Sequence, residues 1–208
     1  MSNVESTLRV EPPRIWLIRH GATEWSLRGK HTGRSDVPLL PEGRAEAKRL
    51  GAHLQNYSFA HVLVSPLLRA RQTCELAGFG PRAEVLPDLA EWDYGDYEGK
   101  TSHQIHQHAP SWSLFRDGCP GGESTAQVSA RLDRAIGDVL TRWHQSAADV
   151  AIFSHGHALR VFALRYLGWP LEAGAQLLLD TTAICRLKDE RGRRSIELWN
   201  DRSHLRPR

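Results

Sequence analysis

Cysteine is scarce in this chain. Its 208 residues include only Cys74, Cys119 and Cys185, which are far apart and form no C-x-x-C motif. An odd number of cysteines at such spacing argues against a disulfide framework and against a metal site built from thiolates. We expect each cysteine to be a small buried residue.

Long apolar runs and a strong net charge are lacking as well. No run approaches the roughly 18–20 apolar residues that span a bilayer. The polar segment from Met1 to Arg14 does not have the form of a secretory signal. We therefore expect a cytoplasmic protein with no membrane partner. The formal net charge of +3 is too small to indicate nucleic acid by itself, but it is compatible with a site that binds an anion.

The composition is that of a chain with a buried core. Hydrophobic residues make up 40% and charged residues 25%, which favours one sizeable domain over residues 1–208. Residues 1–13 are expected to form a loose arm. Six arginines lie in residues 191–208. We interpret this tail as a hairpin with a solvated end, in preference to a contact with phosphate or nucleic acid.

Apolar strands alternate with helical patterns along the chain. Short apolar runs at residues 15–18, 61–64 and 150–153 are typical of strands buried on both faces. Helical patterns cover residues 41–54, 65–77, 124–144 and 156–167, the second of which starts with a capping Ser65 and Pro66. Two late strands are expected at residues 183–187 and 195–199. The alternation predicts an α/β fold, a three-layer α/β/α sandwich with a mostly parallel central sheet.

Two of the predicted strands end in the same way. The first is followed by His20 and Gly21, and a later one by His155 and Gly156. Open α/β sheets bind ligands beyond the carboxyl ends of their strands, so neighbouring strands would bring the two histidines into one pocket. The adjacent Arg19 strengthens a functional interpretation over a structural one.

Four segments carry a family resemblance. They resemble, in the family's order, the motifs of the histidine phosphatase superfamily, which includes the phosphoglycerate mutases: residues 19–25 (RHGATEW), 65–73 (SPLLRARQT), 89–99 (LAEWDYGDYEG) and 154–157 (SHGH). The resemblance implies a phosphoglycerate mutase-like fold. It also implies phosphoryl transfer in two steps through a phosphohistidine, without a cofactor.

The resemblance gives roles to four basic residues. It implies that His20 is the nucleophile, in its neutral form, with its other ring nitrogen donating to a backbone carbonyl. Arg19 and Arg69 would bind the phosphoryl oxygens, and His155 would donate to one of them. Arg71, two residues after Arg69, points to the opposite side of a helix at about 100° per residue, and is expected at the surface.

The resemblance also makes Glu91 the general acid for the leaving oxygen and then the base for water. Two nearby arginines favour a charged carboxylate, which is the wrong form for an acid. A bound phosphate dianion would offset them. We therefore expect better turnover at mildly acidic pH.

Several residues are candidates for substrate contacts. Thr32 and Gly33 fall where the family contacts the phosphate, and Ser26 stands where many members carry Asn; ordinary loop polarity explains Ser26 and Thr32 equally well. The further candidates within the third and fourth motifs are Trp92, Tyr94 and Gly156. Trp92, Trp112 and Phe115 suit either an apolar wall for a sugar or the core. Residues 92–124 are expected to form a lid.

Two features favour hydrolysis over a mutase reaction. Mutases of this family usually carry Arg directly after the acid, where this chain has Trp92. The interval of 64 residues from Glu91 to His155 is shorter than in the mutases. The motifs look most similar to a sedoheptulose-1,7-bisphosphatase branch and a broad-specificity acid phosphatase branch. We expect a phosphatase for small esters, sugar phosphates or bisphosphates; a mutase and a silent phospho-ligand binder remain alternatives, and the resemblance is compatible with a homodimer.

A metal site is the main rival from another class. His103, His106 and His108 lie close together, and His155 and His157 add two more imidazoles. No carboxylate lies at a convincing spacing for a third ligand, so we expect no metal. Three other acidic residues are expected to be structural partners: Glu24, Asp36 and Glu98.

Overall fold

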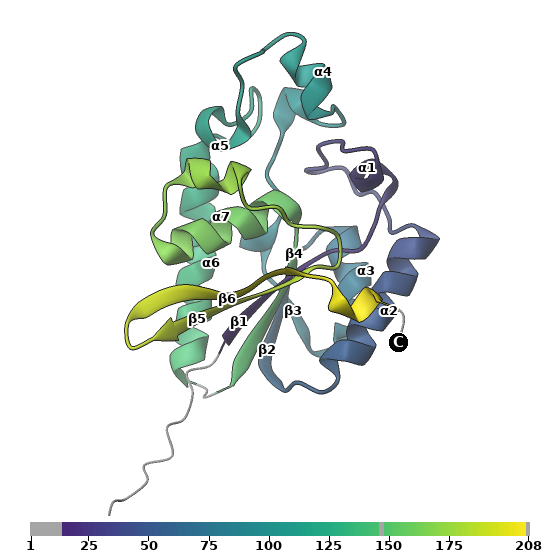
Figure 1. Cartoon of the computed structure of the whole chain (residues 1–208), viewed down its shortest axis with the longest axis vertical. Coiled ribbons are helices and arrows are strands. Elements are labelled where there is room, and N and C mark those ends of the chain that lie inside the picture. Colours follow the sequence, from purple (N-terminus) through teal and green to yellow (C-terminus); the bar gives the residue numbers. More distant parts are fainter. Residues whose placement is uncertain (1–13, 146–147, 207–208) are drawn as a thin grey trace, which may run out of the picture.

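The structure, a computed structural model, describes residues 14–145 and 148–206. Six strands of the described part form one sheet in the order β3-β2-β4-β1-β5-β6 (Figure 1). In chain order these are β1 (Arg14–Arg19), β2 (Phe59–Val64), β3 (Ala83–Val85), β4 (Asp149–Ser154), β5 (Ile184–Glu190) and β6 (Arg193–Asp201). The first four strands of the sheet are parallel, while β5 is antiparallel to β1 and β6 to β5. The predicted mostly parallel sheet is confirmed.

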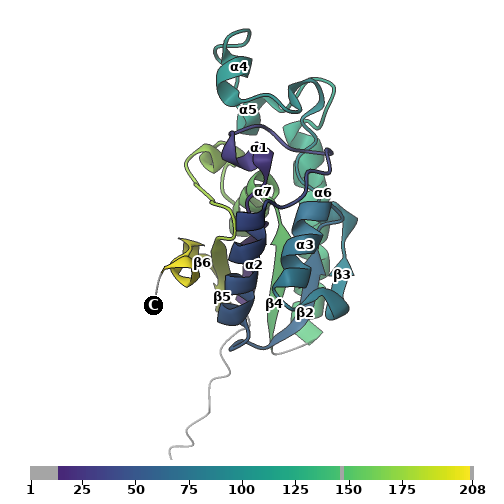
Figure 2. The same ribbon diagram turned by 90° about the vertical axis from the view of Figure 1, so that its right-hand side faces the viewer.

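Four long helices cover the two faces of the sheet. α2 (Pro41–Leu54) and α3 (Leu68–Leu76) lie on one face, and α6 (Thr125–Gln145) and α7 (Gly156–Leu167) lie on the other (Figure 2). Because side chains alternate along β1, Ile15 and Leu17 join one buried cluster, while Trp16 and Ile18 join the other. The expected three layers follow from this alternation.

Shorter elements lie beyond the carboxyl ends of the parallel strands. These are α1 (Glu24–Leu27), α4 (Ser102–His106) and α5 (Leu114–Asp117), of which α4 and α5 form one end of the molecule in Figure 1. Single 3-10 turns complete the path: η1 (Gly80–Arg82), η2 (Pro87–Leu89), η3 (Gly95–Tyr97), η4 (Leu171–Ala175) and η5 (Ser203–Leu205). The lid expected at residues 92–124 contains η3, α4 and α5; its function as a lid stays a prediction.

The start of α3 differs from the prediction. The helix begins at Leu68, not at Ser65; the Ser65 hydroxyl lies 2.6 Å from Nε2 of His155 and accepts from the Leu67 N–H at 3.3 Å, before the helix begins. The Asp36 carboxylate accepts from the Leu68 N–H at 2.7 Å and so caps the helix from a distant loop. Strand β3 was not predicted, and its three residues are half-buried or exposed. Such a short polar edge strand has too little apolar pattern to be identified.

The C-terminal hairpin and the three cysteines agree with the prediction. β5 and β6 form the predicted hairpin, whose turn places Arg191 and Gly192 at φ of 58° and 81°. The three cysteines are free and buried, as predicted. The arm expected at residues 1–13 lies outside the described residues. No helix within residues 14–145 and 148–206 is long and apolar enough to cross a membrane.

Candidate active site

The sheet brings the two histidines together. β1 and β4 are parallel neighbours in which Arg19 pairs with Ser154, so the next residue of each strand is a histidine at the same edge. The ring centroids of His20 and His155 lie 5.2 Å apart, with the rings inclined at 55°. The predicted juxtaposition is therefore present.

The surroundings of His20 fix its tautomer and its charge. Its Nδ1 lies 2.8 Å from the Gly21 carbonyl oxygen, which can only accept, so Nδ1 carries the proton and Nε2 keeps its lone pair. Burial lowers the pKa of His20 well below its usual value, and Arg69 and Arg19 lower it further. The ring is therefore neutral at pH 7. A neutral Nε2 is a nitrogen able to attack phosphorus.

Glycine is required next to His20 by a close backbone approach. A Cβ on Gly21 would lie 2.6 Å from the carbonyl oxygen of Gly43 in α2. The Gly21 N–H donates to the Thr73 hydroxyl on α3 at 3.0 Å, and that hydroxyl donates to the Arg69 carbonyl at 2.7 Å. Both helices of this face thus hold the segment that carries His20.

Arg19 and Arg69 provide positive charge close to His20. Arg69 is fully buried, and its guanidinium donates to the carbonyls of Thr32, Gly33 and Ser35. Arg19 donates to the Leu179 carbonyl, and its Nε has no partner. Burial lowers the pKa of both groups. Among the described residues neither forms an ion pair, which leaves their charge for an anionic ligand.

Glu91 is held at the start of α7. Its Oε1 accepts from the N–H groups of Trp92 at 2.9 Å and Ala158 at 2.8 Å, and its Oε2 accepts from the His157 N–H at 3.1 Å. Arg131 of α6 supports the loop before it by donating to the carbonyls of Asp88 and Ala90. The carboxylate therefore has one fixed orientation at the cavity.

His155 is fully buried beside His20. Its Nε2 lies 2.6 Å from the Ser65 hydroxyl, while its Nδ1 is buried without a partner. Burial, followed by Arg69 and His20, lowers the pKa of His155 well below its usual value. The role of Ser65 was missed, since its sequence context predicts a helix cap.

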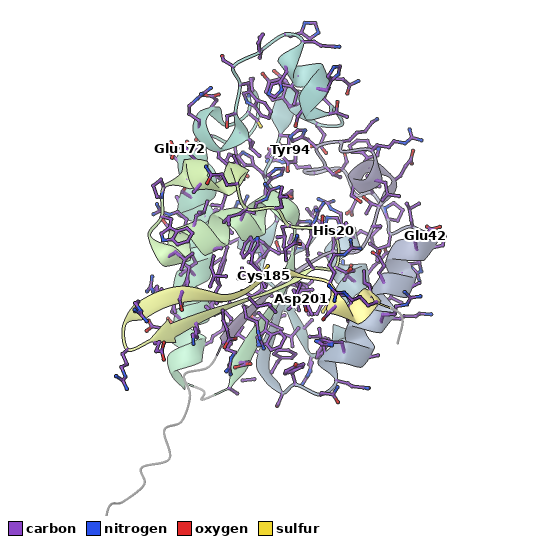
Figure 3. The ribbon with its side chains drawn as sticks, in the orientation of Figure 1. His20, Glu42, Tyr94, Glu172, Cys185 and Asp201 are labelled. Carbon is purple, nitrogen blue, oxygen red and sulfur yellow. The ribbon has the colours of Figure 1, made fainter. Side chains whose placement is uncertain are left out.

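A cavity of about 160 Å³ opens beside Arg19, His20 and Glu91, while the fully buried Arg69 and His155 lie behind its lining. Its lining comes from residues 19–32, from residues 91–102 and from the start of α7; in Figure 3, His20 lies near the edge of the sheet and Tyr94 lies toward α4 and α5. Its lining consists of Arg19, His20, Ser26, Gly29, Lys30, His31, Thr32, Glu91, Tyr94, Ser102, Gly156, His157 and Arg160.

Four of the predicted substrate-contact residues line this cavity. The Ser26 hydroxyl is engaged with the backbone of Thr23 as part of the α1 cap, and the Thr32 hydroxyl donates to the Lys30 carbonyl at 3.2 Å. The Tyr94 hydroxyl lies 2.5 Å from Nδ1 of His157. At Gly156 an added Cβ would lie 3.3 Å from Nε of Arg19, so glycine leaves room for that guanidinium.

Trp92 and Gly33 do not line the cavity. Trp92 is fully buried in the core, where its indole N–H donates to the Glu123 carbonyl at 2.9 Å and its ring meets Phe115 edge-on. The Gly33 N–H donates to the Glu98 carboxylate at 2.9 Å, so it is not free for phosphate. The expectation of substrate contacts for these two residues is corrected: both support the fold around the cavity.

The sequence interpretation missed five lining side chains: Lys30, His31, Ser102, His157 and Arg160. Lys30 and His31 lie in a loop without periodicity. The bridge between Lys30 and Thr101 and the backbone hydrogen bonds of His31 with Gly99 and Lys100 bring this loop to the start of α4. Arg160 carried a usable signal, since it follows Gly156 by four residues and therefore lies on the same face of α7.

The histidines of the alternative metal site, the expected surface arginine and one expected structural carboxylate can also be located in the structure. Within the described residues, no group of three or more His, Cys, Asp or Glu side chains could hold a metal ion. Nε2 of His106 lies 3.0 Å from the Trp112 carbonyl, and His103 and His108 are exposed. Arg71 is exposed, as predicted, and Glu98 is a structural partner that accepts from the N–H groups of Gly33 and Ser35.

Known proteins are similar to this chain in sequence and in fold. Residues 15–202 match the family described as histidine phosphatase superfamily (branch 1). An acid phosphatase of Mycobacterium tuberculosis is 39% identical over 196 residues, which cover 93% of this chain and 95% of that protein. Sedoheptulose 1,7-bisphosphatase of Saccharomyces cerevisiae is 41% identical over 185 residues, which cover 75% of this chain and 68% of that protein.

A solved structure from Mycobacterium tuberculosis superposes with a TM-score of 0.85 at 39% identity and covers 90% of this chain and 97% of its own. The predicted fold and phosphatase chemistry are thus confirmed at the level of the family. The chain belongs to branch 1 of the histidine phosphatase superfamily.

Proposed function

We propose that this enzyme hydrolyses small phosphate monoesters, chiefly sugar phosphates or bisphosphates, through a phosphohistidine at His20. The observation that carries the proposal is the neutral imidazole whose Nδ1 donates to the Gly21 carbonyl. Its Nε2 is left as a nucleophile in a cavity that Arg19 also lines.

In the first step Nε2 of His20 attacks phosphorus, the P–N bond forms and the P–O bond to the leaving group breaks. The leaving oxygen takes a proton from Glu91. Arg19, Arg69 and His155 stabilise the charge on the three phosphoryl oxygens. In the second step Glu91 removes a proton from water, the water oxygen attacks phosphorus, and the P–N bond breaks to release orthophosphate and regenerate His20.

The outer part of the cavity supports a polar, anionic substrate. Lys30, His31 and Arg160 line it in addition to the groups around phosphorus. Arg160 forms no ion pair within the described part of the chain; it donates to the carbonyls of Gly156 and Gly174. A second phosphate or a row of sugar hydroxyls would satisfy these donors. The 41% identity to a protein named for a bisphosphate substrate supports the same class.

A mutase reaction is the second candidate. The buried position of Trp92, next to Glu91, leaves no cation there for a substrate carboxylate. Hydrolysis is therefore preferred, and isomerisation of 3-phosphoglycerate is the outcome that would contradict it.

The test measures phosphate release from a panel of esters in EDTA. The panel contains sedoheptulose 1,7-bisphosphate, fructose bisphosphates, 3-phosphoglycerate, nucleotides and p-nitrophenyl phosphate. We expect hydrolysis without added metal, a preference for sugar phosphates, and an acid-labile phosphoenzyme after rapid quenching that His20→Asn abolishes. No release and no labelling by a folded protein would contradict the proposal and favour a silent phospho-ligand binder.

The location and assembly form part of the same proposal. Three free, buried cysteines support a reducing compartment, and we place the enzyme in the cytoplasm. We propose a homodimer on the family resemblance alone. Cell fractionation tests the first point, and light scattering during gel filtration tests the second.

A further inference from the structure

A second basic groove lies between α2 and η5, apart from the catalytic cavity. It has a volume of about 690 Å³ and shares no lining residue with that cavity. Figures 1 and 2 both show η5, the last turn of the described chain, beside α2. The lining residues are Arg49, Ala52, His53, Gln55, Asn56, Ser203, His204 and Arg206.

The charge of the groove is positive and unbalanced. No acidic residue lines it, and neither Arg49 nor Arg206 forms an ion pair within the described residues. Two acidic residues outside the lining are already engaged. Glu46 pairs through Oε1 with Arg202 at 3.2 Å, while its Oε2 is buried without a partner, and the Asp201 carboxylate accepts from the Ser203 N–H and hydroxyl. The charges of Arg49 and Arg206 are therefore left for a ligand.

His204 gives a second and independent indication. Both of its ring nitrogens are buried without a hydrogen-bond partner. A buried imidazole always carries at least one N–H donor, and such donors are normally matched in folded proteins. The His53 ring lies 6.0 Å from it, centroid to centroid, inclined at 40°. Burial, followed by His53, lowers the pKa of His204 to about 4.

The groove repeats the donor types of the catalytic centre. There, two histidines with centroids 5.2 Å apart lie near two arginines that form no ion pair. Here His53 and His204 lie near Arg49 and Arg206. The arginines disfavour a metal cation and favour a tetrahedral dianion. The amides of Gln55 and Asn56 and the hydroxyl of Ser203 offer neutral partners for hydroxyl groups attached to such an anion.

In place of the solvated end expected for residues 191–208, we propose that the groove between α2 and η5 is a second anion site, which binds phosphate or a small phosphate monoester without hydrolysing it. No carboxylate lines the groove, so it has no general acid for hydrolysis, and we expect it to bind the ligand without catalysis. The ligand is bound by Arg49, Arg206 and His204. The proposal stands independently of the substrate of the catalytic cavity.

The experiment is an NMR titration of protein labelled with ¹⁵N at histidine. Sodium phosphate is added at constant ionic strength, and the imidazole signals of His204 and His20 report on the two sites separately. Sodium sulfate, which is not a reaction product, is titrated in parallel. We expect saturable shifts of His204 with both anions.

Variants decide whether those shifts come from the groove. Arg49→Met should weaken binding at His204 by about tenfold or more, since it removes a hydrogen bond between charged groups, and should leave the His20 curve and p-nitrophenyl phosphate hydrolysis unchanged. Arg206→Met is the second groove variant, and Arg44→Met is the matched control, an exposed arginine of α2 outside the groove. His204 shifts that sodium chloride reproduces, or that Arg44→Met weakens as much as Arg49→Met does, would overturn the proposal.

Discussion

Three neighbouring groups determine the tautomer and the charge of His20. The Gly21 carbonyl fixes its tautomer, and burial with Arg69 and Arg19 lowers its pKa so that the ring stays neutral. The same arginines lack carboxylate partners within the described residues, so the site carries positive charge before substrate binds. A phosphate ester bound there would meet a neutral imidazole among cations, which is the arrangement that the proposed phosphoryl transfer requires.

Glu91→Gln is expected to slow the hydrolysis of esters with poor leaving groups much more than that of esters with good leaving groups. The amide cannot supply a proton, so kcat/KM for a sugar phosphate should fall by about 10²–10⁴. The loss should be much smaller for p-nitrophenyl phosphate, whose leaving group departs as an anion. Steady-state kinetics with both esters checks this. Equal losses of kcat/KM for the two substrates would mean that Glu91 orients other groups of the site and does not transfer the proton.

The pH dependence of hydrolysis tests the source of that proton. The dianion of a phosphate monoester takes up one proton near pH 6, so below that pH the substrate can bring a proton to Glu91. Because the lowered pKa of His20 keeps its ring neutral in the same range, kcat/KM for a sugar phosphate should be higher at pH 6 than at pH 8. A flat profile from pH 5 to 8 would argue against Glu91 as the acid.

Residue type and spacing predicted part of this site. The helical angle separated buried Arg69 from exposed Arg71 correctly, because both lie on one regular helix. Trp92 was a candidate for substrate contact and for the core alike, and it lies in the core; an aromatic side chain next to an acid looks the same in sequence whether it faces a cavity or the core. Lys30 and His31 could not be found, since the fold of their loop decides where they point.

At the scale of the elements, strands and long helices follow from local sequence, while their ends depend on distant groups. The apolar runs predicted β1, β2 and β4, and the order β2-β4-β1 then put His155 beside His20. The start of α3 was wrong by three residues: the acceptor for the first helical N–H, that of Leu68, is Asp36, while Ser65 accepts from the Leu67 N–H before the helix begins. A contact between residues 32 positions apart leaves no periodic signal.

Asp36→Ala should therefore weaken the start of α3. Loss of a capping acceptor lowers the free energy of unfolding by about 0.5–2 kcal/mol. Arg69 lies in the first turn of the same helix, so a lower kcat is expected as well. Urea denaturation and steady-state kinetics measure the two effects. Asp36→Asn keeps an acceptor and should retain most of the stability; equal loss in both variants would show that the charge matters and the cap does not.

At the scale of the whole molecule, the candidate active site lies at one edge of a sheet that separates two buried hydrophobic clusters. One buried cluster lies under α2 and α3 and the other under α6 and α7, and the strands between them end at the cavity. This brings His20, His31, His155 and His157 into buried positions in which burial is the largest cause of a lowered pKa. The catalytic arrangement therefore has a consequence for stability.

The free energy of unfolding is expected to fall as pH drops from 7.5 to 5.5. These histidines bind protons more weakly in the folded chain than in the unfolded chain, where the pKa of a histidine is about 6.5. Their contribution to stability is therefore complete above that pH and is lost as the pH falls below it. Urea denaturation at the two pH values measures the change. The double variant His20→Asn/His155→Asn removes two of the groups and should show a shallower dependence. A wild-type stability that is equal or greater at pH 5.5 would mean that these imidazoles accept protons in the folded state, which is incompatible with a neutral His20 nucleophile.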